Sequence, residues 1–483
     1  NQFLYFLNVD ASHNTTAGFY MKSSLTAMRG NSFAFSTNIS TDLYLINSSL
    51  DHNGAAGVDL RSYNYGPVYA PAFFGGYSYL VQHNIITGTE ATYNGTAGLS
   101  VSTNAQGRYG LNAQYFTIDG ATFDHNTGAG ARFTSSDYYG PGGFGDTFQQ
   151  ITISNSSFSH NGADGLDLLA LATGRQGRAE QHVTITASYL DHNGGDGLHV
   201  YASATNGVYV ATFPCTVVQG LSGGCAFVRQ NVDVFGSDMS YNAGNGAFVG
   251  TYANHYGAIY GASGRPHAPT LELYGATVGH NGGRGLDISN HVSGSSYLYQ
   301  YNAAIDTHFD HNASDGVYAA SYIGGGSTML QRNLVYTYHT GASASYNAGN
   351  GFKSTIEALG GSYARNVNVV EGAGFSHDGA FGIDGAVAYA DGTSTGLQIN
   401  AIYFDGINYN GDGIGLYSIG PGSQQISYIG GDHVHFNAFV GVYGEANFGA
   451  FQYIGVYSFG NYVSGNGTDY LFNAFGGATQ ILN

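Results

Sequence analysis

The sequence predicts an all-β fold, a β-solenoid, from three observations: a recurring phrase, a period-two pattern of β-branched residues beside it, and a near absence of helical periodicity. The phrase reads LDHNGAAGVDL at residues 50–60, FSHNGADGLDL at 158–168 and LDHNGGDGLHV at 190–200. A repeat array can form one continuous body at this length, so we expect a single solenoid over residues 1–483.

The turn of the phrase contains an asparagine, or one aspartate, at intervals that average about 35 residues. Unequal intervals suit a coil of strands, because an insertion at one corner leaves the other strands stacked. We therefore expect about 13 coils, each with room for three strands and a loop. The turn positions are Asn14, Asn53, Asn94, Asn126, Asn161, Asn193, Asn242, Asn281, Asn312, Asn347, Asp378, Asn410 and Asn437.

The strands are predicted from alternation on either side of this turn. Leu166 and Leu168 bracket Asp167, and β-branched runs such as 151–153 and 183–186 lie upstream. In a strand, alternate side chains point to opposite faces, so the apolar residues should face inward and the middle residue outward. The apolar residue three positions before the turn asparagine should also stack inside.

Three residues of the turn have physical roles. Stacked asparagine amides should bond from coil to coil as a ladder. The glycine four residues later, as at Gly165, is expected to adopt a positive φ. The histidine or tyrosine before the asparagine, as at His160 and Tyr93, should form an aromatic column, because a metal ligand would not exchange with tyrosine. The expected ladder comprises Asn53, Asn126, Asn161, Asn193, Asn242, Asn281, Asn312 and Asn347.

The repeat resembles the right-handed parallel β-helix repeats of the pectate-lyase-like superfamily, and is especially similar to bacterial secreted adhesin-like or surface-fibre-like repeat proteins. The resemblance extends over roughly residues 14–441 and implies a right-handed parallel β-helix with inserted loops. It is specific for fold and leaves function open, because that superfamily includes lyases, hydrolases, epimerases, tailspikes and non-catalytic fibres.

Long intervals between turns predict protruding loops rich in tyrosine, glycine and phenylalanine, near residues 61–80, 137–149, 203–231 and 251–270. One loop contains Cys215 and Cys225, which we expect to form a disulfide, with two buried thiols as the alternative. A disulfide indicates an oxidising compartment, so we expect an extracellular or cell-surface location.

Composition excludes some partners. The net charge is −18 and only 9% of residues are charged, with Lys22 and Lys353 as the two lysines. Nucleic acids and anionic membrane surfaces attract clustered cations, so neither is an expected partner. No stretch approaches the roughly 18–20 apolar residues that span a bilayer, so no membrane insertion is expected. Neutral glycans, other proteins and divalent cations remain candidate partners.

Candidate catalytic residues lie in the outward column of the strand after the turn. Arg132, Asp167 and His199 should sit on neighbouring coils, and Asp287 occupies the same position further along. Acid, base and cation on one face suit a polysaccharide lyase or hydrolase, although any solvated strand face is polar at this position. We find no lyase or epimerase motif, no cofactor motif and no metal-ligand spacing; sporadic Ca²⁺ at turn aspartates such as Asp164 is the alternative.

The sequence favours a non-enzymatic secreted protein: a rigid extracellular fibre, adhesin or surface-layer element. Strand-like segments at 3–7 and 478–482 would leave open sheet edges, so end-to-end self-association is expected. Two alternatives stay open. One is a polysaccharide-active enzyme or tailspike on the same fold, and the other is a glycan-binding module that uses the tyrosine-rich loops.

Overall fold

The structure is a computed structural model, and its described residues form strands, turns and bends without any α-helix. It divides into two compact units: unit 1 is Asn1–Asp238 with Thr251–Ala262, and unit 2 is Met239–Gly250 with Ser263–Asn483. The strand β16 (Ala247–Asn254) contains the division. The structure describes residues 2–26, 36–65, 77–106, 109–138, 144–173, 176–205, 217–218, 221–222, 227–254, 258–260, 270–294, 296–338, 341–385, 388–403, 405–456, 461–475 and 477–482.

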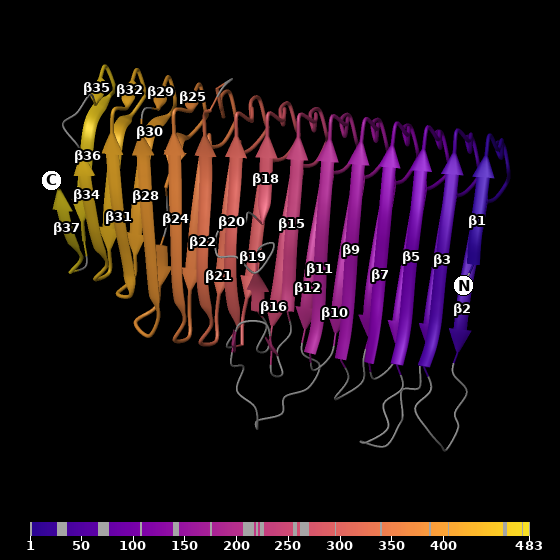
Figure 1. The fold of residues 1–483 in the computed structure, drawn as a ribbon. Helices are drawn as coiled ribbons and strands as arrows, with labels where there is room; N and C mark the ends of the chain where they lie inside the picture. Colours follow the sequence, from indigo (N-terminus) through magenta and orange to yellow (C-terminus); the bar gives the residue numbers. More distant parts are fainter. Residues whose placement is uncertain are drawn as a thin grey trace. The chain divides into compact units, whose positions relative to one another are not determined.

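Each unit is a right-handed parallel β-helix, as the sequence predicts (Figure 1). The chain follows a strand of a first sheet, passes the asparagine turn, and returns along a strand of a second sheet. The first sheet of unit 1 contains β1 (Gln2–Leu7), β3 (Ser36–Ile46), β5 (Tyr77–Thr87), β7 (Tyr109–Asp119), β9 (Phe144–Ser154), β11 (Gln176–Thr186), β15 (Phe227–Phe235) and β17 (Ala258–Tyr260). Its second sheet contains β2 (Phe19–Thr26), β4 (Val58–Tyr65), β6 (Leu99–Gln106), β8 (Ala131–Tyr138), β10 (Leu166–Thr173) and β12 (Leu198–Thr205).

Unit 2 repeats this arrangement. Its first sheet contains β18 (Leu271–Tyr274), β20 (Tyr297–Ile305), β22 (Thr328–Tyr336), β24 (Tyr363–Glu371), β28 (Thr395–Tyr403), β31 (Ser423–Gly430), β34 (Phe451–Val456) and β37 (Thr479–Leu482). Its second sheet contains β19 (Leu286–Val292), β21 (Val317–Ile323), β23 (Phe352–Ala358), β26 (Phe381–Asp384), β27 (Ala388–Ala390), β30 (Asp412–Ile419), β33 (Val440–Asn447) and β36 (Thr468–Ala474).

A third, short sheet lies between the two long ones in each coil. In unit 2 it contains β25 (Gly374–Ser376), β29 (Gly406–Asn408), β32 (His433–His435) and β35 (Tyr462–Ser464). In unit 1 and in the first coils of unit 2 it is reduced to single parallel bridges, such as Ser157 with Tyr189 and Thr277 with His308. Each coil therefore has three β segments, and the parallel register repeats from coil to coil.

The loops expected from the sequence lie partly outside the described residues, and so do Cys215 and Cys225. The described parts of those ranges are mostly strand. Residues 61–65 and 77–80 belong to β4 and β5, and 144–149 belong to β9. The 203–231 range also holds a two-residue antiparallel pair, β13 (Val217–Val218) with β14 (Leu221–Ser222).

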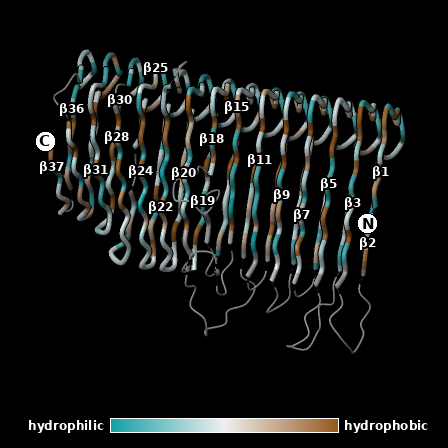
Figure 2. Tube along the Cα trace, viewed as in Figure 1, coloured by the Kyte–Doolittle hydropathy of each residue, from teal (hydrophilic) through white to brown (hydrophobic). Residues whose placement is uncertain are grey.

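The core next to the asparagine turns is apolar. From Asn53 to Asn437, the residue three positions before each turn asparagine or aspartate is fully buried, as at Leu50, Phe158 and Leu190, whereas Ala11 before Asn14 is half-buried. Phe123 stacks on Phe158 with ring centroids 5.2 Å apart. Figure 2 shows apolar and polar residues alternating along the strands, as expected for side chains that point inward and outward in turn.

The core behind the middle of the first-sheet strands is instead polar, although apolar residues of the same strands are also buried, such as Ile151 and Ile153. In unit 1 the Nε2 of Gln149 donates to Gln114 at 2.9 Å, that of Gln181 to Gln149 at 2.8 Å and that of Gln230 to Gln181 at 3.0 Å. In unit 2 the Nδ2 of Asn368 donates to Asn400 at 2.8 Å. These amides are buried and bond along the helix, which satisfies groups that would otherwise be costly to bury.

Candidate functional site

The asparagine turns form a continuous hydrogen-bonded ladder within each unit. Asn161 shows the pattern: its Oδ1 accepts the backbone N–H of Asn126 at 2.9 Å and the Nδ2 of Asn126 at 3.1 Å. Its own N–H and Nδ2 donate to Oδ1 of Asn193 at 3.0 and 3.1 Å. The ladder in unit 1 contains Asn14, Asn53, Asn94, Asn126, Asn161 and Asn193. The ladder in unit 2 contains Asn242, Asn281, Asn312, Asn347, Asp378, Asn410, Asn437 and Asn466.

Sequence reasoning missed Asn466, which accepts the N–H of Asn437 at 2.9 Å and its Nδ2 at 2.9 Å. The motif is weak there, because Gly465 with a φ of +71° takes the place of the aromatic residue. The Asn-Gly pair at 466–467 is the signal that could have located it.

The expectation of a positive φ at the glycine four residues after the asparagine is wrong. Positive φ occurs instead at the aromatic residue before the asparagine, for example +57° at His160 and +56° at Tyr93. The glycine is needed for space: a Cβ on Gly165 would lie 2.7 Å from the oxygen of Gly197 and 2.8 Å from Nδ2 of Asn193. The next coil therefore packs directly against the glycine Cα.

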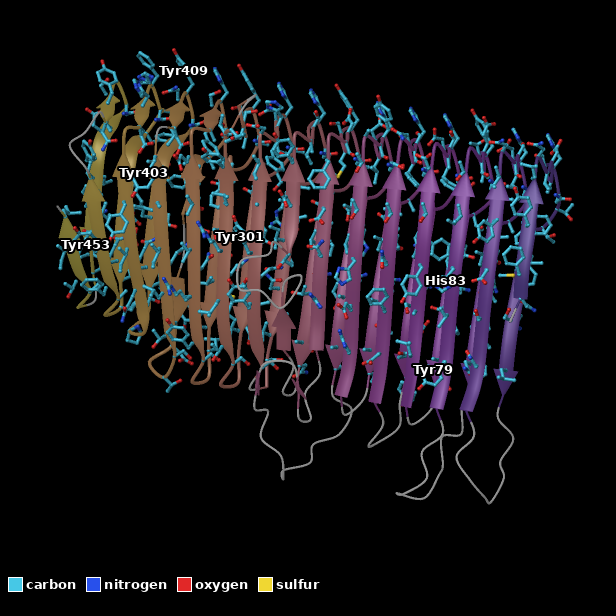
Figure 3. All side chains as sticks on the ribbon, in the orientation of Figure 1. Tyr79, His83, Tyr301, Tyr403, Tyr409 and Tyr453 are labelled. Carbon is cyan, nitrogen blue, oxygen red and sulfur yellow. The ribbon has the colours of Figure 1, made fainter. Side chains whose placement is uncertain are left out.

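The aromatic residues before the asparagines stack in a column along each unit. In unit 1 the His160 ring is 4.8 Å from His125 with a 4° interplanar angle, and 4.7 Å from His192 with a 2° angle. In unit 2 the Tyr346 ring is 4.5 Å from that of His377. The column is about half exposed at its tyrosines, and Tyr409 projects from it in Figure 3. An open trough of about 650 Å³ runs beside the unit 2 column.

Three of the four candidate catalytic residues meet on the second sheet of unit 1. Nε of Arg132 lies 2.7 Å from Oδ2 of Asp167, and Nδ1 of His199 lies 2.9 Å from Oδ1 of Asp167. Burial opposes ionisation of Asp167, but the bond and charge of His199 and the charge of Arg132 outweigh it, so its pKa lies below the usual value. Burial likewise opposes the charge on His199, yet Asp167 raises the pKa of His199.

Asp287 lies in unit 2 and belongs to a different group. Its Oδ2 is 2.6 Å from Nη1 of Arg284, and its Oδ1 accepts the hydroxyl of Ser289 at 2.7 Å. The Arg284 guanidinium also lies 3.6 Å from the centroid of the Tyr318 ring. This aspartate is therefore ion-paired and nearly buried rather than presented to a substrate.

A candidate metal-binding group overlaps the unit 1 cluster. Ligand atoms of Asp164, Asp167 and His199 lie within 4.8 Å of one another. Two carboxylates and an imidazole are donors that suit a divalent transition metal. Asp167 already accepts hydrogen bonds from Arg132 and His199, however, and the guanidinium places a positive charge beside the site. The arrangement therefore favours an ion-pair network over a bound cation.

Sequence reasoning missed a charged cluster on the first sheet of unit 1. The buried carboxylate of Glu180 pairs with Arg178 on the same strand, with Nε2 of His182 at 2.9 Å and with Nη1 of Arg229 at 2.9 Å. Burial disfavours the charge on Glu180, but His182 and the two arginines lower its pKa to about 2. Arginine, glutamate and histidine at alternate positions of 178–182 were the signal for this cluster.

Two further carboxylates flank this cluster. Asp146 pairs with Arg178 in the strand register, and Asp233 lies on β15. Burial raises the pKa of Asp146, and Glu180 raises it further while Arg178 opposes the shift. Burial also raises the pKa of Asp233. A readily protonated carboxyl group beside a strongly ionised one is an arrangement that acid–base chemistry uses.

An aromatic row leads across the same face to this cluster. The ring of His83 stacks on Tyr115 at 4.6 Å, Tyr115 contacts Phe148 at 5.3 Å and Phe148 contacts His182 at 5.6 Å. A hollow of about 320 Å³ opens along the row, with Asp42 beside His83 at 3.3 Å. His83 projects from the first sheet in Figure 3.

In the described part of the chain, no helix has the length and hydrophobicity that crossing a membrane requires. No protein-family model matches the chain, and no curated protein or solved structure shows significant similarity to it.

Proposed function

We propose that the chain is a non-enzymatic structural element of an extracellular fibre or adhesin, as in the secreted β-helix repeat proteins that its sequence resembles. The observation that carries this proposal is the continuity of the turn contacts. Within each unit, turn asparagines bond to those of neighbouring coils, and aromatic side chains stack on one another. These contacts hold successive coils together along the β-helix axis, as a rigid scaffold requires.

The ion pairs support the same proposal. Arg132, Asp167 and His199 hold one another across three coils, and Asp287 is held by Arg284. A catalytic acid or base needs a free atom within reach of the substrate, and these carboxylates use their oxygens for structural bonds. Cell-surface or matrix glycans are the partners proposed for the exposed aromatic side chains, since aromatic rings offer amphipathic contact area.

End-to-end association is part of this proposal. Among the described strands, β1 pairs with β3 alone, and Phe3 and Tyr5 on it are 66% and 54% exposed. Where no further strand covers β1, its edge can pair with another chain.

Electron microscopy of the purified chain over a concentration series tests the structural role, with incubation on surface polysaccharides as the companion assay. The structural role would be supported if microscopy shows particles of β-helical width and the chain releases no oligosaccharide from the polysaccharides. Filaments at high concentration would support end-to-end association. The structural role would be contradicted if the native chain cleaves a polysaccharide and the Asp167→Ala or Asp287→Ala variant does not.

The cluster around Glu180 favours one second candidate, hydrolysis of an acidic polysaccharide. The arginines would bind sugar carboxylates, Asp146 would protonate the leaving oxygen, and a water molecule would attack the sugar carbon. Glu180, whose two oxygens are held by the arginines and His182, would keep the arginines in place. This candidate predicts that Asp146→Asn abolishes product release while Gln150→Ala, on the same strand, retains it. Release that is unchanged in Asp146→Asn, or absent from the native chain, would exclude it.

A further inference from the structure

The outer face of the unit 2 first sheet is apolar, opposite to the usual arrangement of a solvated sheet. Along β28, the outward residues are Leu397, Ile399, Ala401 and Tyr403, while the side chain of Gln398 is buried. We call the outward side of β20, β22, β24, β28, β31 and β34 the apolar face. One register row across it contains Tyr301, Arg332, Val367, Ile399, Ile426 and Tyr453.

This face is turned toward the viewer in Figure 3, where Tyr301, Tyr403 and Tyr453 lie over the strands. Its side chains are half-buried by one another. A contiguous apolar patch of this kind on a soluble protein indicates an interaction site. In the middle of these strands the buried side chains are largely amides, such as Gln398 and Asn400, while the outward side chains are largely aliphatic or aromatic. Contact with a partner would remove these outward apolar side chains from water.

The size of the face matches one side of a protein–protein interface. Six strands at about 4.8 Å spacing and nine residues at about 3.3 Å each give a face of roughly 800 Å². Stable interfaces bury about this area on each partner. A sheet face of this extent is large enough to pack against another sheet, at a separation of about 10 Å.

The charges on the face are distributed so that the face complements itself. Arg365 aligns with Tyr299, in the first half of the strands, and Arg332 lies in the middle row with Tyr301. Glu371 aligns with Ile305, in the second half, and Glu272 of the adjoining strand β18 aligns with Ala303. A second copy turned so that its strands run antiparallel would bring its Arg365 over Glu371 of the first copy.

We propose that the apolar face is a contact surface between two copies of this chain, packed sheet on sheet with antiparallel strands. A two-fold symmetric interface between identical subunits is isologous, which requires a patch that complements itself. Val367 and Val369 then form the centre of the contact, and Arg365 of each copy faces Glu371 of the other. This lateral contact goes beyond the structural role proposed above, because it does not depend on how the chain ends associate.

Sedimentation equilibrium of the intact chain tests the contact. The native chain should be dimeric, and the double variant Val367→Lys with Ile399→Lys should be monomeric with an unchanged far-ultraviolet circular dichroism spectrum. Val81→Lys with Ile85→Lys, at outward positions of β5 in unit 1, is the matched control and should leave the dimer intact. A native chain that stays monomeric at every concentration would overturn the proposal.

A charge exchange tests the antiparallel orientation. Arg365→Glu and Glu371→Arg should each weaken the dimer by about tenfold or more, because like charges then face each other. The double variant should restore the native dissociation constant. If the dimer of the double variant dissociates as readily as that of either single variant, the antiparallel orientation is wrong. A monomer whose face instead binds a glycan or another protein, with loss on Val367→Lys, would assign a different partner and overturn the proposal.

Discussion

Oδ1 of Asp378 accepts two hydrogen bonds from Asn347, one from the backbone N–H at 2.9 Å and one from Nδ2 at 3.1 Å. Its second oxygen, Oδ2, is buried without a partner among the described residues. All the remaining positions of the unit 2 ladder are asparagines, whose amides can donate to the next coil. Burial, together with Asp310 and Asp315, raises the pKa of Asp378 to about 8, although Asn347 opposes the shift. The protonated acid can then donate as an amide does.

Asp378→Asn should therefore stabilise the chain at neutral pH. The folded-state pKa lies above the unfolded value of about 3.9, so stability that is full below about pH 4 is lost as the pH rises to about 8. The variant should regain on the order of 3 kcal/mol at pH 7 and nothing at pH 4. Thermal unfolding at both pH values measures this difference. The reciprocal variant Asn347→Asp should be less stable at pH 7 than at pH 4, and an equal gain for Asp378→Asn at both pH values would contradict the assignment.

Removal of one amide from the middle of the ladder should cost more than removal at its exposed end. Asn161→Ala leaves the N–H and Nδ2 of Asn126 without their buried acceptor, and should destabilise by about 3 kcal/mol. Asn14→Ala is the matched control, because Asn14 is exposed and water can replace its bonds. Denaturant unfolding of both variants gives the comparison. Equal losses would mean that the ladder contributes little beyond local turn structure.

The position before the ladder asparagine should accept tyrosine and reject valine. His160 combines a φ of +57° with rings stacked on both sides. His160→Tyr should change stability by less than about 1 kcal/mol, because the ring contacts persist. His160→Val should cost about 2–4 kcal/mol, since a β-branched residue is strained at this φ and the stacking is lost. His160→Gly separates the two effects: a loss as large as that of valine would show that stacking, not backbone strain, dominates.

Glu180→Gln should destabilise the chain at neutral pH, because two arginines and a histidine lose their shared carboxylate. The folded-state pKa of about 2 lies below the unfolded value of about 4.3, so this stabilisation is present above about pH 4 and is lost as the pH falls toward 2. We expect a loss of about 2 kcal/mol at pH 7 and little near pH 2. Melting temperatures across this range provide the measurement, with exposed Gln150→Ala as control. A variant as stable as the native chain at pH 7 would exclude a structural role for the cluster.

The turn was predictable from the sequence because its chemistry is local. Asn161, the aromatic residue before it and Gly165 recur with fixed spacing, and Phe158 lies three residues earlier at an apolar position that is buried. The reason for the glycine was not predictable, because the atoms that exclude a Cβ there belong to Asn193 and Gly197 of the next coil.

The Glu180 cluster could not be predicted from the sequence, because it depends on the register between two strands that are distant in the chain. Glu180 and Arg229 are 49 residues apart and meet only because β11 and β15 pair in parallel. The interval between their turns is among the least regular in the sequence, so their alignment could not be read from the repeat.

By itself, the sequence determined the coil: the recurring turn, the alternation of the strands and the apolar stack beside the turn. The tertiary structure alone decided which face of each first-sheet strand points inward. Alternation at residues 397–403 is compatible with either face, because a shift of one residue exchanges them. The amides lie inside because they can bond across the interior, as Asn366 does to Ser354 at 2.7 Å, and to neighbouring coils, as Gln452 does to Gln425 at 2.6 Å. The aliphatic residues between them are left on the outer surface as a consequence.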